Sequence, residues 1–329
     1  MKKWKSIIRI SMMIVLVSGS MGAIEKKVAQ TGLQFLKIDM SSRAAAMGGS
    51  YITINNDATS MFYNPAGLAR MESTLDIFAT KTQWFAGISY LGGGVAYNLG
   101  DWGTVGASWM TCDYGDDFIG TQYANTPSGY IETGNLNVTS YAGGFSYAKS
   151  LTNKFSIGAQ VKYCYQQLGE NFIDAAGTVR KNKVSGMAYD FGTIFYPGFK
   201  DFRIGMSIRN FSPEFKYENE GFELPLTFVI GASMDVLDLL GEHENPLLVS
   251  VDATHPRDYT ERLHVGAEYT FMKMISFRAG YKYNYDNERF TAGIGFQQDL
   301  AGVGINIGYA YATMKYFDAV HRISIGMSY

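Results

Sequence analysis

Hydrophobic and polar residues alternate with a period of two along most of this chain. The clearest case is the last segment, where Ile323, Ile325, Met327 and Tyr329 alternate with small and polar residues. A strand that faces lipid on one side and a lumen on the other has this period. The pattern therefore predicts that these four residues face lipid and that the residues between them face inward.

Similar segments recur from about residue 75 onward, and each is bounded by turn residues. We count about fourteen, with the length typical of transmembrane barrel strands. The predicted spans are 75–83, 87–99, 102–114, 134–149, 154–168, 183–196, 201–211, 223–235, 246–254, 260–272, 275–285, 288–298, 301–313 and 320–329. Because the chain ends inside the last span, that strand is expected to close the ring. The predicted fold is all-β, a transmembrane antiparallel β-barrel over residues 74–329.

The gaps between these spans predict the orientation of the barrel. Long polar gaps at 115–133, 169–182 and 212–222 follow odd-numbered strands, whereas most gaps after even-numbered strands are short. Outer-membrane barrels have short periplasmic turns and longer outer loops. Both chain ends are therefore expected on the periplasmic side. The gap at 236–245 is long for a periplasmic turn, and its Val236–Leu240 run predicts a short helix.

Composition agrees with a barrel. The chain has 37 Gly, 7 Pro, 23 Tyr and 21 Phe, which suits strands with a crowded interior and aromatic membrane interfaces. Its mean hydropathy of −0.07 fits hydrophobicity that alternates along strands. Cys112 and Cys164 fall on strands with another strand between them, which puts their Cα atoms about 10 Å apart, too far for a disulfide. We expect two free cysteines on the lumen side.

The first 23 residues predict export. A basic start (Lys2, Lys3, Lys5, Arg9) precedes an apolar run and the small residues that end at Ala23, as in a secretory signal peptide. An uncleaved anchor is the alternative. Cleavage after Ala23 would change the formal net charge from −2 to −6, because the leader carries four basic residues. A mildly acidic exported chain is not expected to bind nucleic acid.

Residues 24–73 do not alternate and predict a small helical unit. Ser41 or Ser42 can cap a short helix that ends at Gly48 or Gly49. Asp57 can cap a second helix that ends at the Asn64–Pro65 step, and Pro65 can begin a further turn. The unit is too small to hold a core of its own. We therefore expect it to pack in the lumen as a hatch.

Charged residues at inward positions describe the expected lumen. They are Lys162, Asp190, Arg203, Arg209, Asp235, Asp252, Arg262, His264, Glu268, Arg278 and Lys282. The turn near residue 273 should set Glu268 opposite Arg278 and His264 opposite Lys282. Charges of both signs in a narrow interior should pair with one another or with the hatch. We favour a lumen pinned shut by such pairs over a selective pore.

Three N-terminal motifs resemble a known family. Phe35–Ile38, Ser42–Gly49 and Asn56–Leu68 look like the opening of the PorV/PorQ family, a branch of the FadL-like long-chain fatty-acid transporter superfamily. The resemblance implies a fourteen-stranded barrel in the bacterial outer membrane with an N-terminal hatch. Its motif residues are, in this chain, Arg43, Gly48, Gly49, Asp57, Asn64, Pro65, Ala66 and Gly67. In the fatty-acid branch the Asn64–Ala66 stretch would lie near the substrate path, and in the PorV branch the role is in type IX protein secretion.

The sequence does not indicate an enzyme. Its four histidines are scattered, the nucleophile-elbow and P-loop motifs are missing, and the glycines of Gly302–Gly308 lie within an alternating strand. Inward serine, histidine and acidic residues could in principle form a barrel hydrolase, but their spacing does not indicate one. We expect no catalytic residues, cofactor or metal.

Two functions remain, with a purely structural barrel as a third. One is a secretion component that docks secretion-system or cargo proteins on the outer loops Tyr114–Tyr130 and Asn210–Phe222. The other is a FadL-like channel for a hydrophobic small molecule. Either would be embedded in outer-membrane lipid. The charged lumen favours the first, because few apolar residues are left to line a pocket.

Overall fold

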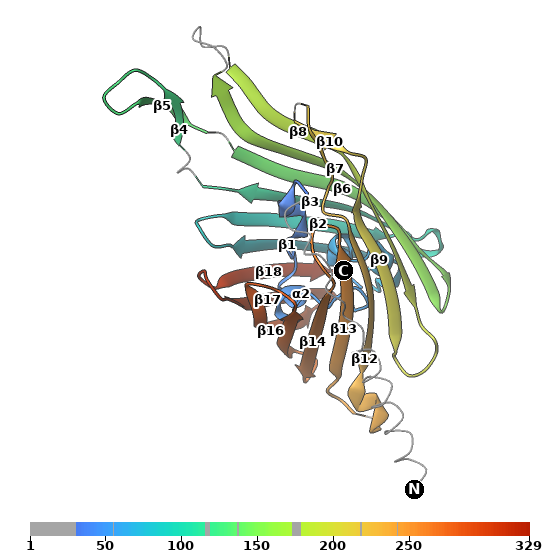
Figure 1. Ribbon diagram of the computed structural model, residues 1–329. Helices are drawn as coiled ribbons and strands as arrows, with labels where there is room; N and C mark the ends of the chain where they lie inside the picture. Colours follow the sequence, from blue (N-terminus) through green and yellow to red (C-terminus); the bar gives the residue numbers. More distant parts are fainter. Residues whose placement is uncertain are drawn as a thin grey trace.

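The computed structural model describes residues 31–54, 56–115, 119–136, 138–172, 179–217, 219–241 and 243–329. Within this part of the chain, fourteen antiparallel strands form one closed barrel with short helices inside it (Figure 1). The predicted all-β barrel with about fourteen strands is therefore confirmed. The predicted signal peptide lies outside the described residues.

Each of the fourteen predicted segments corresponds to one barrel strand, and most boundaries move by a few residues. The strands are β1 (Leu75–Gln83), β2 (Ser89–Asn98), β3 (Thr104–Asp113), β6 (Val138–Thr152), β7 (Phe155–Phe172), β8 (Val179–Phe195), β9 (Arg203–Phe211), β12 (Thr227–Asp235), β13 (Leu247–Pro256), β14 (Arg262–Phe271), β15 (Ile275–Tyr283), β16 (Glu288–Leu300), β17 (Val303–Met314) and β18 (Val320–Ser328). Each pairs with its sequence neighbours among these fourteen, and β18 pairs with β1.

The seam between the first and last strands closes the ring. Leu75 and Tyr329 exchange backbone hydrogen bonds of 2.9 and 2.8 Å at one end of this seam. Along β18, Ile325 is 54% exposed on the outer surface whereas Ser324 is buried. The alternation of the last segment therefore has the predicted faces. We call the end of the barrel at Tyr329 the periplasmic rim and the opposite end the outer rim.

Two small hairpins extend the loops of the outer rim. β4 (Ile119–Tyr123) pairs with β5 (Tyr130–Asn135), and β10 (Phe215–Lys216) pairs with β11 (Gly221–Phe222). The sequence indicated only polar loops here, because runs this short and rich in glycine carry little alternation. At the periplasmic rim, η5 (Gly100–Trp102) and η6 (Val236–Leu239) are short 3₁₀ helices, and η6 confirms the helix predicted in the long turn.

The hatch lies inside the ring (Figure 1). Its elements are η2 (Gln34–Lys37), α2 (Ser42–Ala46), η3 (Ala58–Phe62) and η4 (Pro65–Arg70). Among the described residues, no helix has the length and apolar character needed to cross a bilayer. Three of these hatch helices, α2, η3 and η4, begin at side-chain caps, and the caps of α2 and η3 are among those that the sequence predicted. The Ser41 hydroxyl accepts from the Ala44 N–H, and the Asp57 carboxylate accepts from the Thr59 N–H at 2.9 Å. The two later helices are 3₁₀ rather than α.

Glycines in the wall let the hatch touch it directly. A Cβ at Gly280 of β15 would collide with the backbone N–H of Gly48, and a Cβ at Gly192 of β8 would collide with the Asn64 side chain. The wall is therefore shaped to the hatch on two sides of the lumen. Cys112 on β3 and Cys164 on β7 are free and buried, with β6 between these strands, as predicted.

The lipid-facing surface gives a first prediction. Ile325→Arg, near the middle of β18, should lower the free energy of unfolding by about 2–4 kcal/mol, because arginine is costly at the bilayer midplane. Unfolding by denaturant in lipid vesicles measures this change. Asn125→Arg on the exposed outer loop should change little. Equal effects at the two positions would contradict the assigned face.

Candidate functional site

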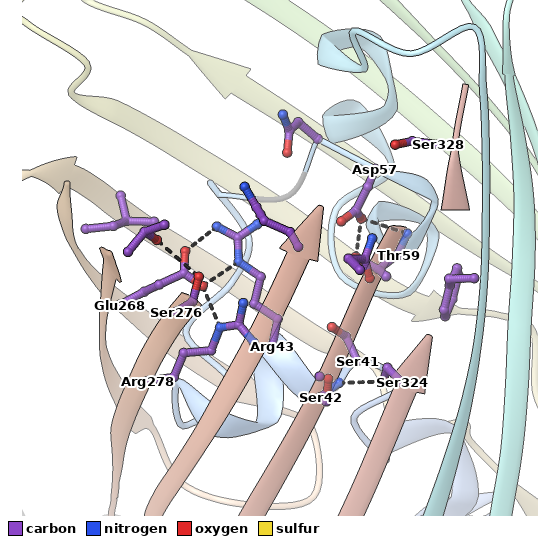
Figure 2. Close-up of a pocket in the computed structure, with 18 of the residues that line it drawn as sticks. Ser41, Ser42, Arg43, Asp57, Thr59, Glu268, Ser276, Arg278, Ser324 and Ser328 are labelled. Atoms are coloured by element: carbon purple, nitrogen blue, oxygen red, sulfur yellow. Dashed lines mark hydrogen bonds and ion pairs between the residues drawn. The ribbon is translucent and has the colours of Figure 1, made fainter. Parts of the chain in front are cut away.

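The centre of the lumen is a carboxylate held by two guanidinium groups. Glu268 on β14 is buried and accepts from Arg43 of α2 at 2.8 and 2.5 Å. It also accepts from Arg278, its cross-strand partner on β15, at 2.5 Å. Figure 2 shows both arginines converging on Glu268 from opposite elements. The predicted pairing of Glu268 with Arg278 is confirmed, and the third member comes from the hatch.

The other predicted strand pair keeps its register but not its contact. His264 and Lys282 lie opposite each other on β14 and β15. The Lys282 ammonium, however, pairs with Glu288 at 2.5 Å and with Asp39 of the hatch at 3.4 Å. His264 Nε2 instead meets the Tyr285 hydroxyl at 2.8 Å. The Lys282 ammonium binds the carboxylates rather than the imidazole of His264, because a hydrogen bond between opposite charges is stronger than one to a neutral ring.

Lys162 and Asp190 form an ion pair across the lumen wall. Their charged atoms lie 2.8 Å apart on β7 and β8. Asn210 completes this group, because its side-chain oxygen accepts from Lys162 at 2.6 Å and its backbone N–H donates to Asp190 at 2.7 Å. Pairing of opposite charges inside the lumen therefore occurs as the sequence analysis expected.

The remaining inward charged residues contact hatch backbone groups, aromatic rings or residues near the rims. Arg209 donates to the Phe62 carbonyl at 3.0 Å, and Asp252 accepts from the hatch N–H groups of Tyr51 and Ile52 at 2.7 and 3.1 Å. The other three lie near the rims. Arg262 lies between two tyrosine rings, Arg203 pairs with Asp201 at 3.2 Å, and Asp235 caps η6.

Asn64 joins the hatch to the barrel. Its buried side chain donates to the Ile52 carbonyl at 2.9 Å and to the Thr193 carbonyl of β8 at 3.1 Å. Its oxygen accepts from the Ala66 N–H at 3.1 Å, which begins η4 at Pro65. The side-chain nitrogen and oxygen of Asn64 both have hydrogen-bond partners, so Asn64 is a structural tie between the hatch and the wall.

Other hatch residues turn the chain or anchor it. Gly48 and Gly49 have φ values of 68° and 78°, a left-handed conformation that favours glycine and ends α2. Pro65, Ala66 and Gly67 are buried in η4. The structure thus brings Arg43 to Glu268, whereas Asp57 is a local cap beside η3.

Two acidic residues outside the predicted set also hold the hatch. Asp258, in the outer loop after β13, accepts from Lys37 at 2.9 Å and from Thr31 at 3.0 Å. Burial alone would raise the pKa of Asp258, but the hydrogen bond and charge of Lys37 hold it below its usual value. Asp39 meets Lys282. Neither residue lies in an alternating segment, so the pattern could not single them out.

The outer loop between β9 and β12 folds inward. Phe215 is buried, and Tyr217 and Phe222 stack with ring centroids 5.2 Å apart against the apolar side of the hatch. The loop Asn210–Phe222 was expected to present aromatic residues to partners. Phe215 is buried and Tyr217 and Phe222 are half-buried in the cluster that contains Leu33 and Phe35 of the hatch, so these rings are less accessible than the sequence analysis expected.

The larger lumen cavities have both polar and apolar residues in their linings. A cavity of about 570 Å³ opens at the periplasmic rim, and Arg43, Asp57, Glu268 and Arg278 are among its lining residues (Figure 2). At the outer rim, a cavity of about 360 Å³ is lined by charged and aromatic residues. The most apolar cavity, about 410 Å³, lies on the lipid-facing side of β7, β8 and β9, where Phe191 and Met206 line it.

In the described residues, one cluster brings together three side chains of the kinds that can bind a metal ion. One atom each of Asp235, Asp238 and His243 lies within 4.8 Å of the others at the periplasmic rim. Both Asp235 oxygens already accept hydrogen bonds, from two backbone N–H groups and from His243. The group therefore serves as a cap for η6 and an anchor for the turn.

Comparisons with known proteins agree on the family and the fold. A family model described as "Type IX secretion system protein PorV" matches residues 21–255. A search of curated proteins found no match.

Among solved structures, the CymD monoaromatic hydrocarbon channel is similar at a TM-score of 0.59 and 13% identity, covering 88% of this chain and 96% of that one. The toluene transporter TbuX of Ralstonia pickettii has a TM-score of 0.56 and 14% identity, with 88% and 98% covered. A FadL homologue of Pseudomonas aeruginosa has a TM-score of 0.53 and 11% identity, covering 88% of this chain and 98% of that one. At such identities these likenesses show the barrel fold alone.

The Glu268 group gives a second prediction. Glu268→Gln removes a buried carboxylate and leaves two guanidinium groups without their acid, which should lower the free energy of unfolding by about 3 kcal/mol. It should also loosen α2, so the variant should conduct small ions in planar bilayers more than the parent chain. Glu132→Gln on the exposed β5 hairpin is the matched control. If Glu268→Gln had the same stability and the same low conductance as this control, the Glu268 group would not be what holds the hatch.

Proposed function

Since the chain belongs to the PorV family of type IX secretion system proteins and lies in the bacterial outer membrane, we propose that it docks cargo or partner proteins during secretion. In this proposal the outer rim is the docking face. The barrel positions that face at the cell surface, and the hatch keeps the lumen closed.

The observation that carries the proposal is the β4–β5 hairpin. It stands away from the barrel near the ends of β7 and β8, the longest strands (Figure 1). Tyr123 is 85% exposed on it, and Tyr130 and Ile131 are also exposed. Aromatic residues of this kind are enriched in protein interfaces.

The backbone of the hairpin adds a second feature. In the described residues β4 and β5 form a sheet of their own, so each has one edge without a neighbouring strand. An exposed edge can pair with an extended segment of another protein, and neighbouring side chains then supply specificity. The hairpin is therefore suited to bind an extended stretch of a secreted protein.

The lumen supports a role at the surface rather than through the pore. The hatch is tied to the wall by the Arg43–Glu268 clamp, by Asn64 and by the Lys37–Asp258 pair. These ties and others, such as the hydrogen bonds from the hatch backbone to Asp252, would have to break before a protein chain could pass through the lumen. Cargo would then meet this protein at its outer rim.

A channel for hydrophobic small molecules is the alternative. The similar solved structures named above include such channels, and this chain shares their fold. Under the outer loops, however, the cavity among Leu36, Met61 and Met110 is about 20 Å³. The larger outer-rim cavity of about 360 Å³ has charged residues in its lining, Lys37, Asp39, Arg262, Lys282 and Glu288 among them. Pockets for apolar ligands are lined mainly by hydrophobic side chains, so the charges in the larger cavity do not suit an acyl chain or an aromatic hydrocarbon.

The proposal predicts that partner binding depends on the hairpin. Tyr123→Ser combined with Tyr130→Ser should reduce recovery of secreted or secretion-system proteins that are cross-linked to the barrel in native membranes, because two exposed aromatic contacts are lost. Tyr316→Ser, at an exposed aromatic in another outer loop, is the control. All three proteins should remain equally folded, as judged by thermal unfolding in detergent.

Two results would count against the docking role. One is equal recovery of partners by the double variant, the control and the parent chain. The other is saturable binding of a hydrocarbon or fatty acid to the purified barrel with no protein recovered from membranes, which would favour the channel.

A further inference from the structure

A small cavity lies on the outer side of the hatch, against β9, β14 and β15. Its volume is about 60 Å³, and the residues that line it include Arg209, Arg262, His264 and Lys282. It adjoins the larger outer cavity, since both are lined by Lys37, Asp39, Arg262, Lys282 and Tyr285. Asp286 and Asn287 of an outer loop line the larger cavity, so the small one is reached from the outer rim.

Nitrogen atoms without hydrogen-bond partners are concentrated at this cavity. Among the described residues, three side-chain nitrogens are both buried and unpartnered: Arg209 Nε, Arg262 Nε and His264 Nδ1. All three residues line the cavity. His264 is only 8% exposed, and its other nitrogen is occupied by the Tyr285 hydroxyl. Buried donors usually have a partner, so three at one place need an explanation.

Arg262 is held between two aromatic rings. Its guanidinium lies 4.0 Å from the Tyr259 ring centroid and 3.9 Å from the Tyr285 ring centroid. Two stacked rings fix the plane of the guanidinium and leave its N–H edges free to donate. The buried Nε of Arg262 has no hydrogen-bond partner.

The charges around the cavity are mainly positive. Its cations are Lys37, Arg209, Arg262 and Lys282, and its one carboxylate is Asp39. Burial alone would raise the pKa of Asp39, yet Lys282, Arg322 and Arg209 hold it below its usual value. Lys37 and Lys282 have acidic partners, whereas Arg209 has a backbone carbonyl and Arg262 has two rings.

We propose that this cavity binds a single oxyanion of phosphate size. Arg209 and Arg262 would donate through their free N–H groups, Lys282 would supply charge, and His264 would donate from Nδ1 while Nε2 accepts from Tyr285. The cavity volume equals roughly two water molecules, which suits one such group and nothing larger. The adjoining cavity leaves room for whatever carries the group.

The site does not depend on the docking role proposed above. That role rests on the β4–β5 hairpin, whereas the anion site rests on β9, β14, β15 and the hatch. An oxyanion bound here would bridge the wall and the hatch on the side facing the cell exterior. It would therefore stabilise the hatch in its closed position.

The test is titration of the purified full chain in detergent with inorganic phosphate, at constant ionic strength and with chloride as the replaced ion. We expect saturable binding with one phosphate per chain by calorimetry, and a rise in the thermal unfolding midpoint. Arg262→Gln should weaken binding at least tenfold, and Arg262→Lys should weaken it less. Arg203→Gln, at the periplasmic mouth, is the matched control and should bind as the parent does.

Glycerol 3-phosphate tests whether the bound phosphate is free or carried on a larger molecule, and acetate tests whether the site prefers a phosphate-sized anion. Binding of glycerol 3-phosphate as well as phosphate would support a site for a phosphate carried on a larger molecule, and binding of phosphate alone would support the free ion. Tighter binding of acetate than of phosphate would overturn the assignment to a phosphate-sized group. The proposal also fails if the parent chain shows no saturable phosphate binding, or if Arg262→Gln and Arg203→Gln bind phosphate equally.

Discussion

Every backbone polar group in the hydrocarbon region of a membrane must find a partner within the protein, and the structure depends on this constraint. The chain meets it by pairing β18 with β1, which leaves no open edge in the ring. A ring of fourteen strands encloses a wide lumen that side chains from the wall alone do not fill. The interior therefore requires a plug, and the plug requires polar partners. The hatch and the lumen charges follow from the closure of the ring.

The hatch is held by a few specific polar contacts rather than by a large core. The Glu268 carboxylate joins the hatch to two strands, Asn64 bonds to a strand carbonyl, and Asp252 accepts from two hatch N–H groups. These groups are buried, so removing one partner leaves another polar group unsatisfied. An apolar plug would slide more easily, because apolar contacts have little directional preference. The polar ties fix one position of the hatch.

The sequence predicted the strands well because a lipid-facing wall imposes a period of two over many residues. It also predicted a cap at Asp57 and one at Ser41 or Ser42, of which the structure has Ser41, since capping depends on the residue itself and its near neighbours. It identified Glu268 with Arg278 because turn position fixes register. These features are local or follow from strand geometry.

Contacts between the hatch and the wall could not be predicted in the same way. The third member of the Glu268 group, Arg43, lies more than two hundred residues away in the chain. Lys282 lies opposite His264 but binds Asp39 and Glu288, because charge decides among several side chains within reach. The inward fold of Phe215 and Tyr217 depends on the apolar surface of the hatch beneath them, which no pattern within the loop reveals.

The place of the hatch along the chain has a consequence for how the barrel is assembled. The hatch precedes the first strand, and the seam cannot form until the last strand has arrived. Hatch residues contact both sides of this seam, since the Ser42 N–H donates to Ser324 of β18 and the Ala58 N–H donates to Asp76 of β1. A segment that binds both edges before they meet lowers the entropy cost of bringing the ends together. If the hatch binds these strands before they pair, it would act as an internal template for closure of the ring and would be enclosed when the seam forms.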